Sequence, residues 1–180
     1  MSNARQHISV VACEVPSLSV LDRSLIEGAF FHDSYRVPLS RAPASVVEVF
    51  FAIFGHHPRW MKAVLVFRNW LASRFGLEAS TTAEIMRPEV KASFRVGEKI
   101  GPWPIFHITE TELIAGRNNK HLDFRLSVLK EVSGEGSSAV VSTVCMTHNT
   151  FGRLYLLLVI PFHKRGVRWL MSRALAEGRL

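Results

Sequence analysis

The sequence has few cysteines and no hydrophobic run long enough to span a bilayer. Its longest apolar run, Leu154 to Phe162, covers about nine residues, against the roughly 20 that a transmembrane helix requires. The first residues, Met1 to His7, are polar and do not form the start of a secretory signal peptide. The 180 residues include two cysteines, Cys13 and Cys145, and so few thiols are typical of a reducing compartment. We therefore expect a cytoplasmic protein without a transmembrane segment.

The common catalytic and cofactor-binding motifs are also missing. The sequence has no Gly-x-Ser-x-Gly nucleophile turn, no glycine-rich phosphate loop and no dinucleotide fingerprint. Gly97 to Gly101 contains two glycines, but it joins two predicted strands and does not open a helix. Glu110 and Glu112 lack the pattern of glycosidase carboxylates, which face each other across a substrate. The sequence therefore predicts no cofactor.

The charge is unbalanced, with a formal net charge of +7. An excess of positive charge of this size has two interpretations. It attracts nucleic acid or an anionic membrane, or it belongs to an ordinary solvated surface that binds neither. Most basic residues are scattered, and only Lys164, Arg165, Arg168 and Arg173 are clustered, with no nucleic-acid-binding motif beside them. We favour a solvated surface, expect no nucleic-acid partner, and keep a peripheral membrane or protein partner as the alternative for the basic C-terminal segment.

That C-terminal segment carries the longest helical pattern, from Thr150 to Glu177. Asn149 and Thr150 provide N-cap side chains, and a helix of this length would be roughly 40 Å long. Pro161 removes a backbone N–H group and predicts a kink. The apolar stripe that we expect to face the core consists of Phe151, Leu154, Tyr155, Leu158, Phe162, Gly166, Trp169, Leu170 and Ala174.

The preceding segments predict one strand, two helices and then several strands. The strands are expected at His32 to Leu39, Glu89 to Val96, Pro104 to Thr109, Thr111 to Arg117, His121 to Val132 and Ser138 to Thr147. The helices are expected after Ser45, with Val46, Val49, Phe50, Ile53 and Phe54 facing inward, and from Arg59 to Leu77. Short connections favour an antiparallel meander.

This order predicts an α+β fold in which a curved antiparallel sheet wraps around the long C-terminal helix, with two short helices after the first strand. At 180 residues, one domain is the default. We expect an N-terminal arm over residues 1–32 and a single domain over residues 33–180.

Several stretches resemble a bacterial domain family of unknown function, whose members are free-standing or attached to the C-terminus of short-chain-dehydrogenase-like proteins. The first stretch is Arg68-Asn69 with Phe75-Gly76-Leu77, and the second is His121 to Arg125. The third runs from Gly152-Arg153-Leu154-Tyr155 to Pro161-Phe162-His163. The element order is similar to the helix-grip fold of START-type and birch-pollen-allergen-like proteins, the SRPBCC or polyketide cyclase superfamily. The resemblance covers roughly residues 33–174. It implies this fold and a candidate pocket, and it transfers no catalytic residues.

The histidines offer the main candidates for chemistry. His56 and His57 are adjacent in a predicted turn, with no Cys or carboxylate at ligand spacing, so we predict a solvated turn and no metal site. His163 lies beside the predicted kink. We favour a structural bond from His163 to a backbone carbonyl freed by Pro161, and the alternative is that its ring projects into the cavity.

His121, Asp123 and Arg125 share one face of a predicted strand. On an inward face, an Asp123–Arg125 salt bridge would position His121 for proton transfer. We favour the alternative, in which these three residues lie on a solvated outer face and Leu122 and Phe124 fill the core side.

Aromatic residues would form the apolar wall of a pocket, and the polar residues around it would orient a ligand. The candidate ligand-binding residues are Trp60, Phe67, Trp103, Phe106, His107, Asp123, Arg125, His148, Tyr155 and His163. A binding module for a small apolar or amphipathic molecule ranks first among the functional hypotheses. A cofactor-independent enzyme of the cyclase or dehydratase type ranks second. An interaction domain for a reductase-like partner or an anionic membrane ranks third.

Overall fold

A seven-stranded antiparallel sheet forms the centre of the computed structural model, with strand order β1-β2-β7-β6-β5-β4-β3. The structure describes residues 9–21, 23–40, 45–58, 61, 63, 66, 91, 93–134 and 136–180. The strands are β1 Val11–Ala12, β2 Phe31–Pro38, β3 Lys99–Ile100, β4 Trp103–Ile108, β5 Glu112–Arg117, β6 Leu122–Ser133 and β7 Gly136–Thr147. The helices are α1 Arg23–Glu27, α2 Val46–Phe54 and α5 Thr150–Ala176.

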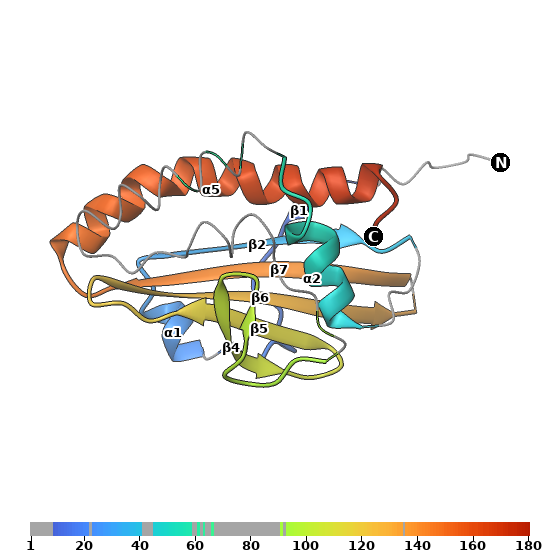
Figure 1. Ribbon diagram of the computed structural model, residues 1–180, viewed down its shortest axis with the longest axis horizontal. Helices are drawn as coiled ribbons and strands as arrows, with labels where there is room; N and C mark the ends of the chain where they lie inside the picture. The colour runs from blue at the N-terminus through green and yellow to red at the C-terminus, as the bar shows by residue number, and fades with distance from the viewer. Residues whose placement is uncertain are drawn as a thin grey trace.

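The expected α+β helix-grip arrangement is confirmed, because α5 runs along the sheet and packs against β2 and β7 (Figure 1). Asn149 caps the start of α5 by accepting a hydrogen bond from the Gly152 backbone N–H, as predicted. The predicted inward face of α2 is also confirmed, residue for residue. No helix within the described residues is long and apolar enough to cross a membrane.

Two of the elements predicted from the sequence are not confirmed by the structure. The predicted helix from Arg59 to Leu77 lies mostly outside the described residues. Its described residues, Met61, Ala63 and Val66, are helical. The predicted strand from Glu89 to Val96 is wrong for its described residues. There the Arg95 N–H donates to the Glu98 carboxylate, so the backbone turns, and pairing with β4 begins only beyond this turn. The predicted domain boundary at residue 32 stays a prediction.

The face of the sheet toward α5 carries the main core. Alternate residues of β2, β5, β6 and β7 point to this face, because successive side chains in a strand lie on opposite sides. They pack with α2 and with the C-terminal half of α5, through Val167, Leu170, Met171 and Ala174. The N-terminal half of α5 packs through Leu156 on a smaller cluster with Leu122 and Cys145.

The rotation of α5 about its own axis differs from the prediction in the first half of the helix, whereas the predicted inward residues Leu170 and Ala174 of the second half are buried. Leu154, Leu158 and Phe162 were expected to face the core, but they are 62%, 63% and 69% exposed. The buried residues in the first half of the helix are instead Gly152 and Leu156. The run from Leu154 to Phe162 is apolar on every side, so its periodicity does not indicate which side is buried.

The opposite face of the sheet is covered by the N-terminal segment. Leu21 packs on Ile114 and Val144 there, with Val15, Ile26 and Ala29 around them. Glu112, which is 2% exposed, anchors this segment. Its carboxylate accepts hydrogen bonds from the Ser19 hydroxyl at 2.6 Å, the Val20 N–H at 2.7 Å and the Ser127 hydroxyl at 2.5 Å. Glu112 is therefore a structural residue that joins residues 19–20 to the sheet.

We expect Glu112→Ala to lower the free energy of unfolding by about 3 kcal/mol, because each buried donor left without an acceptor costs about 1–3 kcal/mol. Urea denaturation followed by circular dichroism measures this loss. Glu110→Ala is the matched control, since Glu110 is exposed in the same hairpin and its removal should change stability by less than about 0.5 kcal/mol. Equal losses in the two variants would contradict the anchoring role.

Candidate functional site

A group of polar side chains lies on the face of the sheet that α5 covers. Asp33 and Tyr35 come from β2, and Thr143 and Cys145 come from β7. Asp33 pairs directly with Thr143 in the strand register. Tyr35 belongs to the main core, and Cys145 packs with Leu156 of α5. Together with His163 of α5, these residues are called the α5–sheet polar cluster.

His163 brings the helix into this cluster. Its Nε2 atom lies 3.2 Å from Oδ1 of Asp33, and the two side chains are 22% and 10% exposed. The His163 ring also meets Phe31 edge-on, with ring centroids 5.6 Å apart. The ring therefore projects toward the sheet, and its Nε2 atom bonds a carboxylate from β2 rather than a carbonyl freed by Pro161.

The two weakly acidic groups of the cluster are held in their protonated forms. Burial, followed by the charge of Asp33 and a hydrogen bond to it, raises the pKa of Tyr35 to about 12, although Arg168 acts in the opposite direction. Burial, followed by the charge of Asp33, raises the pKa of Cys145 to about 12. At neutral pH the Tyr35 hydroxyl is therefore a hydrogen-bond donor, and Cys145 is a thiol of low nucleophilicity.

Two polar atoms of the cluster are buried without a hydrogen-bond partner within the described part of the chain. They are Oδ2 of Asp33 and Oγ1 of Thr143. A buried polar atom without a partner costs about 1–3 kcal/mol, so native proteins usually supply one, either from the chain, from water or from a ligand. Asp33 and Thr143 face each other across the β2–β7 ladder. They therefore offer an acceptor and a hydroxyl at one place.

Apolar residues surround these polar atoms on both sides along α5. Toward the start of the helix lie Phe31, Phe124, Tyr155 and Ile160, packed around the smaller cluster of Leu122, Cys145 and Leu156. Toward its end lies the main core with Val167 and Leu170. The arrangement is a small polar centre among apolar side chains.

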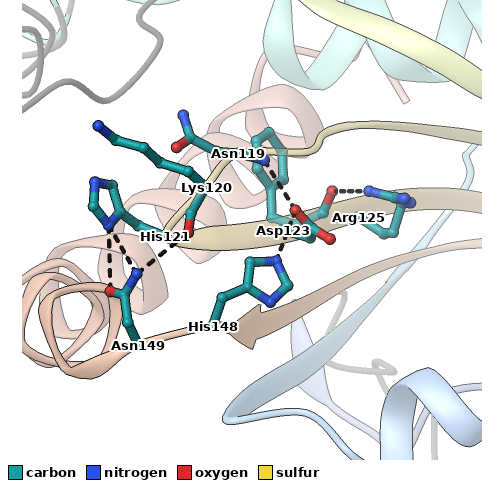
Figure 2. Close-up of polar contacts among 8 residues, drawn as sticks. Asn119, Lys120, His121, Asp123, Arg125, His148 and Asn149 are labelled. Carbon is teal, nitrogen blue, oxygen red and sulfur yellow. Dashed lines mark hydrogen bonds and ion pairs between the residues drawn. The ribbon is translucent and has the colours of Figure 1, made fainter.

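A second polar group lies where β6 begins, β7 ends and α5 begins (Figure 2). Oδ1 of Asp123 lies 3.1 Å from Nε2 of His148 and accepts the Asn119 N–H at 2.9 Å. Asn149 contacts Nδ1 of His121 at 3.0 Å while it caps α5.

Close packing reinforces this junction, because a Cβ atom at Gly152 would collide with the carbonyl oxygen of His121. The contacts fix the start of α5 against β6, which is a structural role.

The orientation of β6 decides between the two hypotheses for His121, Asp123 and Arg125. Leu122 and Phe124 pack on the α5 side of the sheet, so Asp123 and Arg125 lie on the opposite face, as the favoured alternative expected. They are not solvated as it expected, because both residues are partly buried and the Asp123 side chain is 17% exposed. Asp123 meets His148 there. The Arg125 guanidinium lies 3.7 Å from the centroid of the Phe106 ring. The condition that would have made these three residues catalytic candidates is therefore not met.

The other predicted ligand-binding residues are divided between the two faces. Tyr155 and His163 lie at the α5–sheet polar cluster, whereas Trp103 packs on the main core, with edge-on contacts to Phe50, Phe54 and Phe124. His107 is paired with Ile114, a residue of the face that the N-terminal segment covers. Trp60 and Phe67 lie outside the described residues. Within the described part of the chain, no group of three or more His, Cys, Asp or Glu residues is arranged to hold a metal ion.

Sequence reasoning missed Asp33 and Thr143 as site residues. A signal for Asp33 was present, because it lies two residues before Tyr35 and four before Val37, and alternate residues of a strand share one face. A carboxylate at an inward position of an apolar strand is costly unless it has a partner or a function. No comparable signal marks Thr143, since threonine is common in strands.

Comparison with known protein families gives one match. A family described as "Protein of unknown function (DUF2867)" matches residues 25–169, from α1 through most of α5. The match agrees with the family of unknown function that the short motifs resemble. No curated protein matches the sequence.

We expect the two cysteines to differ in reactivity. At pH 8, a thiol with a pKa near 12 is ionised to only about one part in 10,000, and thiolate is the reactive form. In the native protein, Ellman's reagent should therefore modify Cys13, which is only partly buried, well before Cys145, whereas both should react quickly in urea. Cys145→Ser should leave the fast native phase unchanged. A fast phase that disappears in this variant would contradict the burial of Cys145.

Proposed function

The protein belongs to the DUF2867 family of proteins of unknown function, and we propose that it binds a small amphipathic molecule between the sheet and α5. One observation carries this proposal: Oδ2 of Asp33 and Oγ1 of Thr143 are buried side by side beneath α5, without a partner among the described residues. The similarity of the element order to START-type proteins supports the same location for a ligand. Both cysteines are free thiols, which supports a cytoplasmic location.

The chemistry of the two atoms narrows the class of ligand. A carboxylate only accepts hydrogen bonds, whereas a threonine hydroxyl both donates and accepts. A ligand hydroxyl can donate to Asp33 and accept from Thr143, and so it can satisfy both atoms at once. A ligand carboxylate would instead bring a second negative charge beside Asp33. The proposed ligand therefore has a neutral hydroxyl head and an apolar body, which would pack against Phe31, Phe124 and Leu156.

A second candidate function is supported by the convergence of Asp33, Tyr35 and His163. In a cofactor-independent enzyme of the cyclase or dehydratase type, Asp33 would orient His163 for proton transfer to or from a bound substrate. Binding ranks first because it requires only the hydrogen-bonding atoms already described. Catalysis requires in addition that a ring nitrogen of His163 be directed at the substrate.

Binding of chain-matched amphiphiles tests the proposal. We expect a medium-chain primary alcohol to raise the melting temperature in a concentration-dependent way, because a ligand that binds only the folded state stabilises it. The carboxylate of the same chain length should raise it less. Asp33→Asn removes the charge and should reduce this discrimination, whereas Asp123→Asn, at the junction of β6 and α5, should not change it. The absence of a shift with any chain length would contradict the proposal.

Thr143→Val separates ligand binding from folding. Valine has nearly the same shape and removes a buried hydroxyl that has no partner in the described residues, so the free energy of unfolding should stay the same or rise by up to about 1 kcal/mol. Affinity for the alcohol should fall by about tenfold, the equivalent of one lost hydrogen bond of about 1.4 kcal/mol. Calorimetric titration and urea denaturation measure the two effects. Unchanged affinity would show that Thr143 does not contact the ligand.

A further inference from the structure

The first half of α5 exposes a contiguous apolar surface. Leu154, Leu157, Leu158 and Phe162 are 62%, 59%, 63% and 69% exposed. At helical spacing these residues are neighbours on one side of the helix, and the exposed Pro161 lies among them. Single exposed leucines are common on protein surfaces, but a contiguous group of this kind marks an interaction site. We call these five residues the α5 apolar patch.

The charged residues of α5 all have the same sign. From Thr150 to Ala176 the helix contains no aspartate or glutamate, and its charged residues are Arg153, Lys164, Arg165, Arg168 and Arg173. Arg153 and Arg165 are exposed at the two ends of the patch. Arg165 lies seven positions after Leu158, two helical turns along the same side. The patch is therefore bordered by positive charge along the helix.

From this combination we infer that α5 docks the protein on the surface of an anionic lipid bilayer. An amphipathic helix that lies in the interface buries its apolar side at the boundary of headgroups and acyl chains, while basic residues contact lipid phosphates. Basic residues near such a surface add attraction that salt weakens. The net charge of +7 favours the same partner. The inference goes beyond the proposed ligand site and does not depend on it, since the α5 apolar patch is exposed and the α5–sheet polar cluster is buried.

The charge pattern disfavours a second copy of the chain as the occupant. A symmetric dimer would place the same helical surface of both copies face to face. Because this helix has only basic charged residues, the two copies would bring like charges together, which opposes association. An anionic bilayer supplies the complementary charge and the apolar phase in one surface.

Sedimentation with vesicles tests the inference on the full chain. We expect binding to vesicles of phosphatidylcholine with about one third phosphatidylglycerol, much weaker binding to phosphatidylcholine alone, and loss of binding as salt rises from about 50 to about 500 mM. Phe162→Glu should weaken binding at least tenfold. Arg165→Gln should weaken it roughly fivefold, the equivalent of one basic contact. Val132→Glu is the matched control, because Val132 is 79% exposed on β6, and it should bind as the unmodified chain does.

Several outcomes would overturn the inference. They are no sedimentation with either vesicle, equal binding to both vesicles without a salt effect, and normal binding by Phe162→Glu with its circular dichroism unchanged. A dimer in light scattering that Phe162→Glu dissociates would also overturn it, since the patch would then be occupied by a second copy. Thr143→Val should keep full vesicle binding, so failure of the ligand proposal and failure of the membrane inference are distinguishable.

Discussion

The burial of one face of the sheet beneath α5 is the constraint on which the rest of the structure depends. Two contacts determine how the helix is rotated above the strands. At its start, Gly152 packs against the His121 carbonyl, where no side chain fits. At its end, Leu170, Met171 and Ala174 are fully inserted in the main core. Since both ends of the helix are held against the sheet, these contacts also limit which residues between them meet it.

Between those two contacts, the sheet and the helix meet through polar rather than apolar groups. The His163 ring and the Asp33 carboxylate meet there at hydrogen-bonding distance, and their neighbours Tyr35 and Cys145 remain protonated because burial and the Asp33 charge oppose ionisation. Polar groups beneath a helix lower stability relative to a filled apolar core. Their presence at this place, with two buried polar atoms left without partners in the described residues, is the type of local conflict that functional sites show.

The two sides of α5 therefore have different compositions and different proposed roles. The side toward the sheet carries His163, which contacts Asp33, and the core residues, and the exposed side carries apolar residues bordered by positive charge. Because these surfaces share one helix, a protein docked through its exposed side would hold the α5–sheet polar cluster close to the bilayer. An amphipathic ligand would then have a short path between membrane and protein.

Local pattern in the sequence determined most of the strands, their antiparallel pairing, the inward face of α2 and the N-cap of α5, because these depend on residues only a few positions apart. Tertiary structure alone decided the rotation of the first half of α5, since the run from Leu154 to Phe162 is apolar on every side and all its rotations bury similar surface. It also decided which groups meet. His163 pairs with Asp33 across 130 positions, and Ser19 reaches Glu112 across 93. Periodicity indicates which side of an element is buried, but it does not indicate which residues of another element that side will contact. The candidate site is made of such contacts between elements.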